Sequence, residues 1–206
     1  MSHVAFRAAA LAVLTVTLVR PAAGQRIVGT NQTGPAADPI ILPNEGLFQA
    51  RFASVGDDVF IAGQPTEAAL RELSAKGVTT VVNLRMPEEM AKVGFDEAAL
   101  LKELGLAYVH IPTRGTKENP YAPSDLERFA TALASAQGKV LLHCTVAWRA
   151  SHLWAAYLIQ YRKVPVTTAL AQARAINLRD DQPYGGQQPI EGFLGRPVPE
   201  LVRPKP

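Results

Sequence analysis

The chain has 206 residues, 48% of them hydrophobic and 19% charged, with 15 glycines and 16 prolines, which excludes collagen-like, coiled-coil and wholly disordered proteins. Its single cysteine excludes an intrachain disulfide framework and a cysteine-rich zinc site. The formal net charge of +3 falls to +1 without residues 1–24, so the charge indicates neither a nucleic-acid partner nor binding to a membrane surface.

Residues 1–24 have the pattern of a cleavable export signal. A short positively charged start is followed by a 12-residue apolar run, Ala8 to Val19, and small residues precede a predicted cut after Gly24. The alternative is an uncleaved membrane anchor, but Arg20 closes the run well short of the roughly 20 residues that span a bilayer. We therefore expect a periplasmic or secreted protein, without stable membrane insertion once the signal is removed.

The elements predicted after the signal alternate between strand and helix. Residues 25–46 are rich in Gly, Pro and Asn and predict an irregular leader. In chain order, we predict a hairpin over 52–62, a helix from an N-cap at Thr66 to Lys76, a strand over 78–84, a helix over 96–104, a strand over 106–111, a helix over 124–138, a strand over 139–143, helices over 149–162 and 167–176, and a largely irregular Pro/Gly-rich tail over 181–206.

The alternation of these elements indicates the fold class. The helix over 124–138 opens on Ser124–Glu127, a capping-box sequence, and Gly77 ends the helix that begins at Thr66. Strands that alternate with helices form mainly parallel sheets that are covered on both faces. We therefore predict a three-layer α/β fold in one domain over 47–180, with a central, mainly parallel sheet flanked by helices.

The residues with the clearest chemistry lie where the strand over 139–143 turns into a helix. Ligands of open α/β sheets bind outside the carboxyl ends of the strands, which is the position of Cys144. The N–H groups of the turn and of the helix N-terminus would form an anion cradle, and together with Arg149 they favour the thiolate form of Cys144. Arg149 also offers a planar fork to two oxygens of a tetrahedral anion. The alternative without a function is that Cys144 is a small buried residue and Arg149 an ordinary helical arginine. The helix dipole, however, disfavours a positive charge at the N-terminus of a helix, where Arg149 stands.

Four segments occur in an order that resembles a known family: FIAGQP at 60–65, VVNLR at 81–85 followed by Glu88 and Glu89, HIP at 110–112, and HCTVAWR at 143–149. The set resembles the bacterial phosphatase-like family found fused to β-lactamase-like hydrolases, a relative of dual-specificity and tyrosine phosphatases. The resemblance covers about residues 47–180 and implies a phosphatase-type α/β fold. It implies that Cys144 attacks a phosphate monoester, of the phosphotyrosine type among others, and that Arg149 binds the anion. The expected partner is thus a phosphorylated or other anionic substrate.

The loop departs from tyrosine phosphatases in its length. Those enzymes place five residues between Cys and Arg, whereas Cys144 and Arg149 enclose four, and Ala150 stands at the usual Arg position. This spacing resembles the active loop of rhodanese-type sulfurtransferases, in which the cysteine carries a persulfide. Sulfur transfer through a Cys144 persulfide is therefore an alternative function. A catalytically inactive module that binds an anion or a protein is a second alternative.

Two loop residues differ from the family pattern. The family usually has Gly where Ala147 stands, so Ala147 would be strained by roughly 1–2 kcal/mol if this position needs a positive φ. Trp148 is bulky for a loop that wraps an anion, and it either walls the pocket or stacks on an aromatic substrate. The other residues expected to contact substrate are Thr145, Val146, Ala147, Trp148, Ala150 and Arg85.

A general acid is harder to identify. Dual-specificity phosphatases carry an Asp soon after the strand that corresponds to 107–112, but residues 113–119 contain no Asp, and Glu118 is the nearest carboxylate. Asp125 is explained by its place in the first turn of a helix. Arg85 would line the crevice or pair with Glu88 or Glu89. The histidines show no metal-ligand spacing, so we expect neither a metal nor a cofactor.

Overall fold

A computed structural model describes residues 37–179 and 187–201, so the predicted export signal over 1–24 lies outside the described residues. Six strands form one sheet in the order β1-β2-β3-β6-β4-β5. The strands are β1 (Pro39–Ile41), β2 (Phe52–Val55), β3 (Val59–Ala62), β4 (Val78–Asn83), β5 (Ala107–His110) and β6 (Lys139–His143). The helices are α1 (Glu67–Ala75), α2 (Pro87–Met90), α3 (Glu97–Glu103), α4 (Pro123–Ser135), α5 (Trp148–Gln160), α6 (Val166–Ile176) and α7 (Pro189–Leu194).

The sheet is mainly parallel, as predicted. Strands β3, β6, β4 and β5 run parallel to one another, while β1 and β2 are added antiparallel at the β3 edge. Ala62 of β3 and Asn83 of β4 both lie opposite His143, the last residue of β6. The three central strands therefore end at the same edge of the sheet, and the segments that follow them meet there.

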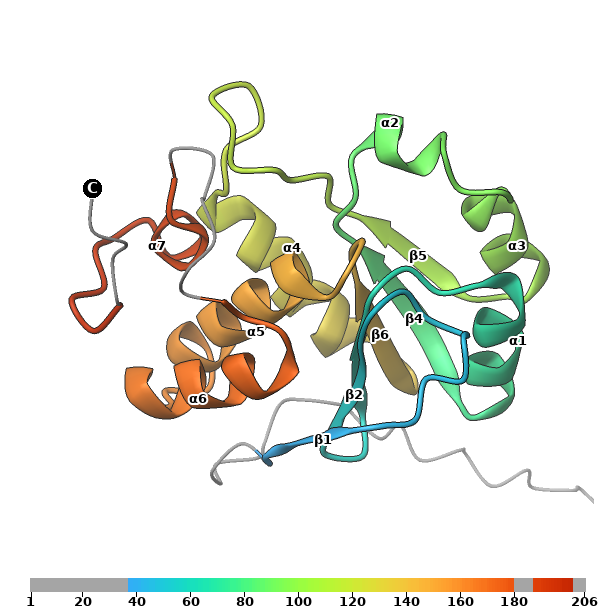
Figure 1. Cartoon of the computed structure of the whole chain (residues 1–206), viewed down its shortest axis with the longest axis horizontal. Coiled ribbons are helices and arrows are strands. Elements are labelled where there is room, and N and C mark those ends of the chain that lie inside the picture. Colours follow the sequence, from blue (N-terminus) through green and yellow to red (C-terminus); the bar gives the residue numbers. More distant parts are fainter. Residues whose placement is uncertain (1–36, 180–186, 202–206) are drawn as a thin grey trace, which may run out of the picture.

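Helices cover both faces of the sheet, which confirms the three-layer α/β fold (Figure 1). Helices α1 and α3 lie on one face, and α4, α5 and α6 lie on the other, where α7 packs on α4 and α5. Neighbouring residues of β6 alternate between the two layers: Leu141 joins the core under α1 and α3, and Leu142 joins the core under α4 to α7. Every residue of α5 from Arg149 to Ile159 is buried, so this helix is the centre of the larger layer. No helix among the described residues is long and apolar enough to cross a bilayer.

Local sequence signals set several element ends. The predicted hairpin over 52–62 is formed by β2 and β3, and Thr66 caps α1 by accepting a hydrogen bond from the Ala69 N–H at 3.2 Å. The capping box predicted at Ser124–Glu127 is wrong, because the N-cap of α4 is Ala122, two residues before Ser124. Asp125 accepts a hydrogen bond from the Ala122 N–H at 3.2 Å, and Pro123 supplies the first helical residue, for which its fixed φ is suited.

The leader and the tail contain more structure than the sequence indicated. Strand β1, within the leader predicted as irregular, pairs with β2 through Ile40 and its neighbours. Helix α7 forms within the tail predicted as irregular, and Ile190 and Phe193 are fully buried there. The Phe193 ring lies 5.0 Å from the Tyr121 ring. Residues beyond 180 thus contribute to the core beside α4 and α5.

Candidate active site

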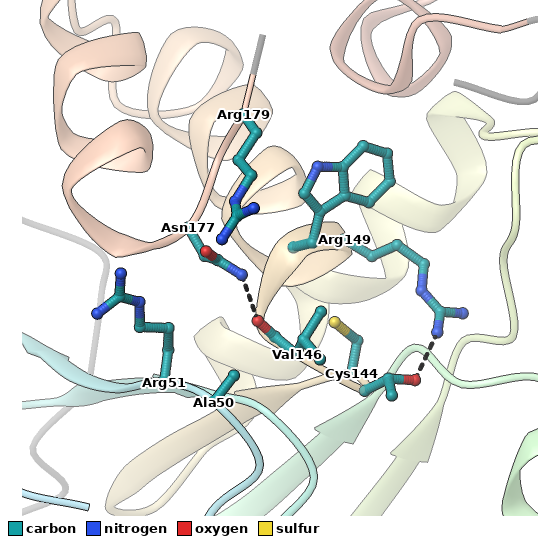
Figure 2. A pocket seen from close by; sticks show the side chains of 9 residues that line it. Ala50, Arg51, Cys144, Val146, Arg149, Asn177 and Arg179 are labelled. Carbon is teal, nitrogen blue, oxygen red and sulfur yellow. Dashed lines mark hydrogen bonds between the residues drawn. The ribbon is translucent and has the colours of Figure 1, made fainter. Parts of the chain in front are cut away.

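Cys144 follows β6 directly, at the edge where the central strands end. The residue is 1% exposed, and its N–H donates to the Ala62 carbonyl at 3.3 Å. Its sulfur faces a pocket of about 610 Å³, within the range of small-molecule sites (Figure 2). The pocket is lined by Ala50, Arg51, Cys144, Thr145, Val146, Trp148, Arg149, Asn177 and Arg179.

The chain turns from β6 into α5 through a left-handed residue. Ala147 has φ +65° and ψ 0°, and α5 begins at the next residue. The backbone N–H groups of Thr145 and Val146 have no acceptor among the described residues, and the first N–H groups of a helix have no partner within it. Asn177 holds the turn from the other side, because its amide donates to the Val146 carbonyl at 2.5 Å. The turn therefore brings backbone donors to the pocket beside Cys144.

The sequence predicts that Ala147 is strained if its position needs a positive φ, and the residue does have a positive φ. Ala147→Gly is expected to raise the free energy of unfolding by about 1 kcal/mol, because glycine adopts the left-handed region without a Cβ penalty. Urea unfolding of the two proteins measures the difference. The matched Ala150→Gly change, in the first turn of α5, should lower stability instead. A loss of stability in Ala147→Gly would contradict the strain.

Arg149 is held by a dense set of acceptors. Its Nη1 donates to the carbonyls of Leu84 and Thr113 at 3.0 and 2.9 Å. Glu89 accepts from both terminal nitrogens, at 2.9 Å from Nη1 and 2.7 Å from Nη2, and Nη2 also lies 3.1 Å from the Thr145 hydroxyl. The planar fork expected to grip an anion is thus occupied by Glu89. The Nε–H group of Arg149 has no acceptor among the described residues and remains available to a ligand.

The carboxylate of Glu89 is the negatively charged partner of Arg149. Burial would raise its pKa, but hydrogen bonds from Arg149 and the Met86 N–H outweigh it and lower the pKa to about 2. The ionised carboxylate also accepts from the Thr145 hydroxyl at 3.0 Å and lies 3.6 Å from Arg114. Glu89 therefore fixes the loop of Cys144 to helix α2 and neutralises Arg149 at neutral pH.

A second buried carboxylate lies beneath the site. Glu97 is 2% exposed and accepts hydrogen bonds from Gln64 at 2.8 Å and Asn83 at 2.9 Å, and its Oε1 lies 3.1 Å from Nε2 of His143. Burial would raise the pKa of Glu97, but the His143 charge and these hydrogen bonds lower it to about 2. The network joins the Gly-Gln-Pro segment, the end of β4 and the residue just before Cys144.

Glu97→Gln is expected to lower the free energy of unfolding by about 3 kcal/mol at pH 7, because it removes a buried carboxylate that accepts hydrogen bonds from Gln64 and Asn83. The folded pKa lies below the ordinary value of 4.5, so ionised Glu97 stabilises the fold fully above about pH 4.5, and this contribution is lost as the pH falls towards 2. Urea unfolding should show a smaller difference in the free energy of unfolding between wild type and Glu97→Gln at pH 3 than at pH 7. Glu72→Gln, in an exposed ion pair, is the control and should change stability little. An equal difference in stability at both pH values would contradict the stabilising role of ionised Glu97.

The structure brings five of the predicted site residues to the pocket: Cys144, Thr145, Val146, Trp148 and Arg149. Ala147 and Ala150 are fully buried and do not line it. Glu118 is exposed in the loop between β5 and α4 and is not a lining residue either.

Arg85 does not form the expected ion pair with Glu88 or Glu89. It is buried, and its side chain donates to the Gln64 side chain at 2.6 Å and to the Glu89 backbone carbonyl at 2.9 Å. Arg114 pairs with both carboxylates instead, because it follows β5 at the same edge of the sheet. Arg85 thus stabilises the segment beneath the pocket.

Four lining residues were missed by the sequence analysis: Ala50, Arg51, Asn177 and Arg179. One signal could have found Arg51. The hairpin places the start of β2 beside the end of β3, since Phe52 lies opposite Ala62. Arg51 therefore had to lie at the same edge as Cys144. Asn177 and Arg179 follow α6, whose packing no local pattern reveals.

The central part of the chain is similar to a known protein family. The family model for the phosphatase-like domain of beta-lactamase hydrolase-like proteins matches residues 51–160. A beta-lactamase hydrolase-like protein from Xylella fastidiosa (strain 9a5c) is 33% identical over 107 residues, which cover 51% of this chain and 24% of that protein. The chain spans about a quarter of the length of the curated relatives it matches.

Solved structures with a similar fold include two from bacteria. A candidate phosphatase (DUF442) from Shewanella putrefaciens CN-32 is 28% identical, with a TM-score of 0.56, covering 74% of this chain and 95% of that chain. TpbA from P. aeruginosa is 17% identical, with a TM-score of 0.56, covering 77% of this chain and 95% of that chain. At this sequence identity, the similarity to TpbA shows a shared fold alone.

Proposed function

The chain belongs to the family of phosphatase-like domains of beta-lactamase hydrolase-like proteins, and from this premise we propose that it is a cysteine-dependent phosphatase acting on phosphate monoesters. The observation that carries the proposal is the position of the thiol. Cys144 faces a pocket that three arginines also line, and none of the described lining residues is a carboxylate. An anion is therefore the ligand that this pocket favours, and among the described lining residues Cys144 is the one whose side chain forms a good nucleophile.

The reaction proceeds in two displacements at phosphorus. The Cys144 thiolate attacks the phosphorus atom, an S–P bond forms, and the P–O bond to the alcohol breaks, leaving a phosphocysteine. Water then attacks the phosphorus, the S–P bond breaks, and inorganic phosphate leaves with the thiolate restored. The N–H groups of Thr145 and Val146 and the Nε–H of Arg149 stabilise the charge that develops on the phosphoryl oxygens.

The need to protonate the leaving oxygen determines which phosphate esters should react fastest. None of the described lining residues is a carboxylic acid, and Glu118 is exposed and is not one of them. Esters whose alcohol leaves as a stable anion need the least help from an acid. Aryl phosphates should therefore react faster than alkyl phosphates, in keeping with a phosphotyrosine-type substrate.

Sulfur transfer is the second candidate, because the four-residue spacing between Cys144 and Arg149 suits it, as does the lack of an acid among the described lining residues. The Cys144 thiolate would attack the outer sulfur of thiosulfate, and the S–S bond would break to release sulfite. The resulting persulfide would then pass its outer sulfur to a thiol or to cyanide. This reaction needs no proton donor for the leaving group.

Parallel assays of the purified protein separate the candidates. The protein is incubated with 4-nitrophenyl phosphate and, separately, with thiosulfate plus cyanide, and acid-quenched samples are analysed by peptide mass spectrometry. Phosphate release with a phosphorylated Cys144 peptide supports the phosphatase. Thiocyanate with a persulfide on Cys144 would overturn it in favour of sulfur transfer. Neither product, with phosphonate binding retained, would leave an inactive anion-binding module.

A further inference from the structure

We propose that Asn177 is a positioning residue of the active site, whose side-chain amide holds the Val146 carbonyl so that this oxygen does not oppose an anion at Cys144. The inference rests on the proposed phosphatase function and adds a residue to its machinery. Asn177 lies outside the loop of Cys144, at the end of α6. Both Asn177 and Val146 line the pocket that Cys144 faces, and Figure 2 shows the hydrogen bond between them.

The Val146 carbonyl is the one in the turn that depends on a side chain from another element. On one side of it, the Thr145 carbonyl accepts from the Gln64 N–H at 2.9 Å. On the other side, the Ala147 carbonyl accepts from the Ser151 N–H at 2.9 Å, within the first turn of α5. The backbone therefore satisfies both neighbouring carbonyls, whereas the Val146 carbonyl accepts from the Asn177 amide, 31 residues further along the chain.

Asn177 is placed for this task by the end of α6. Its N–H and that of Leu178 both donate to the Ala173 carbonyl, at 3.0 and 2.9 Å. Ile176 and Leu178, on either side of it, are buried in the core under α4 to α7. Asn177 itself is 8% exposed. The side chain thus projects from a fixed segment, and because a carbonyl oxygen can only accept, the group that meets it is the amide NH2.

Without this donor the turn would suit an anion less well. An unpaired carbonyl oxygen carries a partial negative charge, and at the wall of a small pocket it would repel the phosphoryl oxygens. The next residue, Ala147, has φ +65°, a conformation that a non-glycine residue keeps only when its surroundings hold it. The bond from Asn177 acts on the peptide unit that joins Val146 to Ala147, so it both covers the oxygen and restrains the turn.

Calorimetric titration of phenylphosphonate into Cys144→Ser protein measures anion binding without turnover. Adding Asn177→Leu, which is similar in size but has no donor, should lower the affinity at least about tenfold. Asn177→Ala should show the same loss, and it gives the answer if the leucine variant does not fold. Asn177→His places a ring N–H on the same side-chain branch as the amide nitrogen and should recover most of the affinity. Unchanged affinity without the donor, or an equal loss in the histidine variant, would overturn the proposal.

Gln187→Ala is the matched control, because the side-chain amide of Gln187 also bonds a backbone carbonyl of a distant segment. It donates to the Tyr121 carbonyl at 3.0 Å, and neither residue lines the pocket. This variant should lose stability in urea while its phenylphosphonate affinity stays within about twofold of the parent protein. A tenfold loss of affinity here as well would assign the effect to general loosening of the fold, and would overturn the proposal.

Turnover separates this proposal from the phosphatase function on which it rests. With Cys144 restored, Asn177→Leu should lower kcat/KM for 4-nitrophenyl phosphate at least about tenfold. A protein whose phosphonate affinity depends on Asn177 but which hydrolyses no ester would refute the phosphatase and leave the positioning role of Asn177 standing. An active phosphatase in which Asn177→Leu changes neither affinity nor kcat/KM would overturn the positioning role alone.

Discussion

Replacing Cys144 by serine is expected to lower the rate of phosphate release from 4-nitrophenyl phosphate by at least about 1,000-fold. A serine hydroxyl needs a neighbouring base to become a nucleophile, and the described lining residues include neither a histidine nor a carboxylate. His143 precedes the cysteine, but its ring is fully buried against Glu97 beneath the loop. Initial rates of phosphate release by wild-type and variant protein give the ratio.

Two controls make this result specific to the thiol. The Cys144→Ser protein should retain its phenylphosphonate affinity and its urea midpoint, since the two side chains are of similar size. Trp148→Phe, a change in the pocket wall that keeps the thiol, should retain most of the activity. Hydrolysis at the wild-type rate by Cys144→Ser would remove the cysteine from the mechanism.

Gly63→Ala should be among the most destabilising single changes in the chain, with a loss of more than about 4 kcal/mol in the free energy of unfolding. A Cβ atom at this position would lie 1.6 Å from the Gln49 carbonyl oxygen and 2.9 Å from that of Thr145. Both contacts are with backbone, so no side-chain rotation relieves them. The segment that carries Arg51 would have to leave the sheet edge, and phosphatase activity should fall with stability.

Gly94→Ala is the matched control for this change. A Cβ atom at Gly94 would have no heavy atom within 4 Å, and the residue has no positive φ. Its urea unfolding curve should therefore lie close to that of the wild type. Equal stability of the Gly63 and Gly94 variants would show that the segments around Gln49 and Thr145 are not packed as closely as the structure has them.

The fold was predictable wherever an element carries its own local signals. Thr66 and Gly77 bracket α1, and the apolar run over 139–143 coincides with β6. Helices α2 and α7 were not predicted, because helices of four and six residues are too short to be stable alone and form through packing on the rest of the fold. The early start of α4 was missed because Asp125 replaces Ser124 as the polar residue that satisfies the helix end.

The site was predictable only along the loop itself. Cys144 to Arg149 are consecutive after a recognisable strand, so their convergence follows from local geometry. The partner of Arg149 was not foreseen, since Glu89 is brought to it by the parallel pairing of β4 with β6. Arg51 and Arg179 are far apart in the sequence and line the same pocket only in the folded protein. They are positioned by strand register and helix packing, which the sequence does not express locally.

The position of β6 in the sheet has a consequence for how the protein folds. It is the last of the described strands along the chain, yet it pairs with β3 on one side and β4 on the other. Such pairing between distant segments closes long loops and makes folding slow. Because Cys144 continues directly from β6, the thiol is covered only once this strand has docked. The pocket that the sulfur faces is therefore completed only when β6 has docked, so the nucleophile is assembled late in folding.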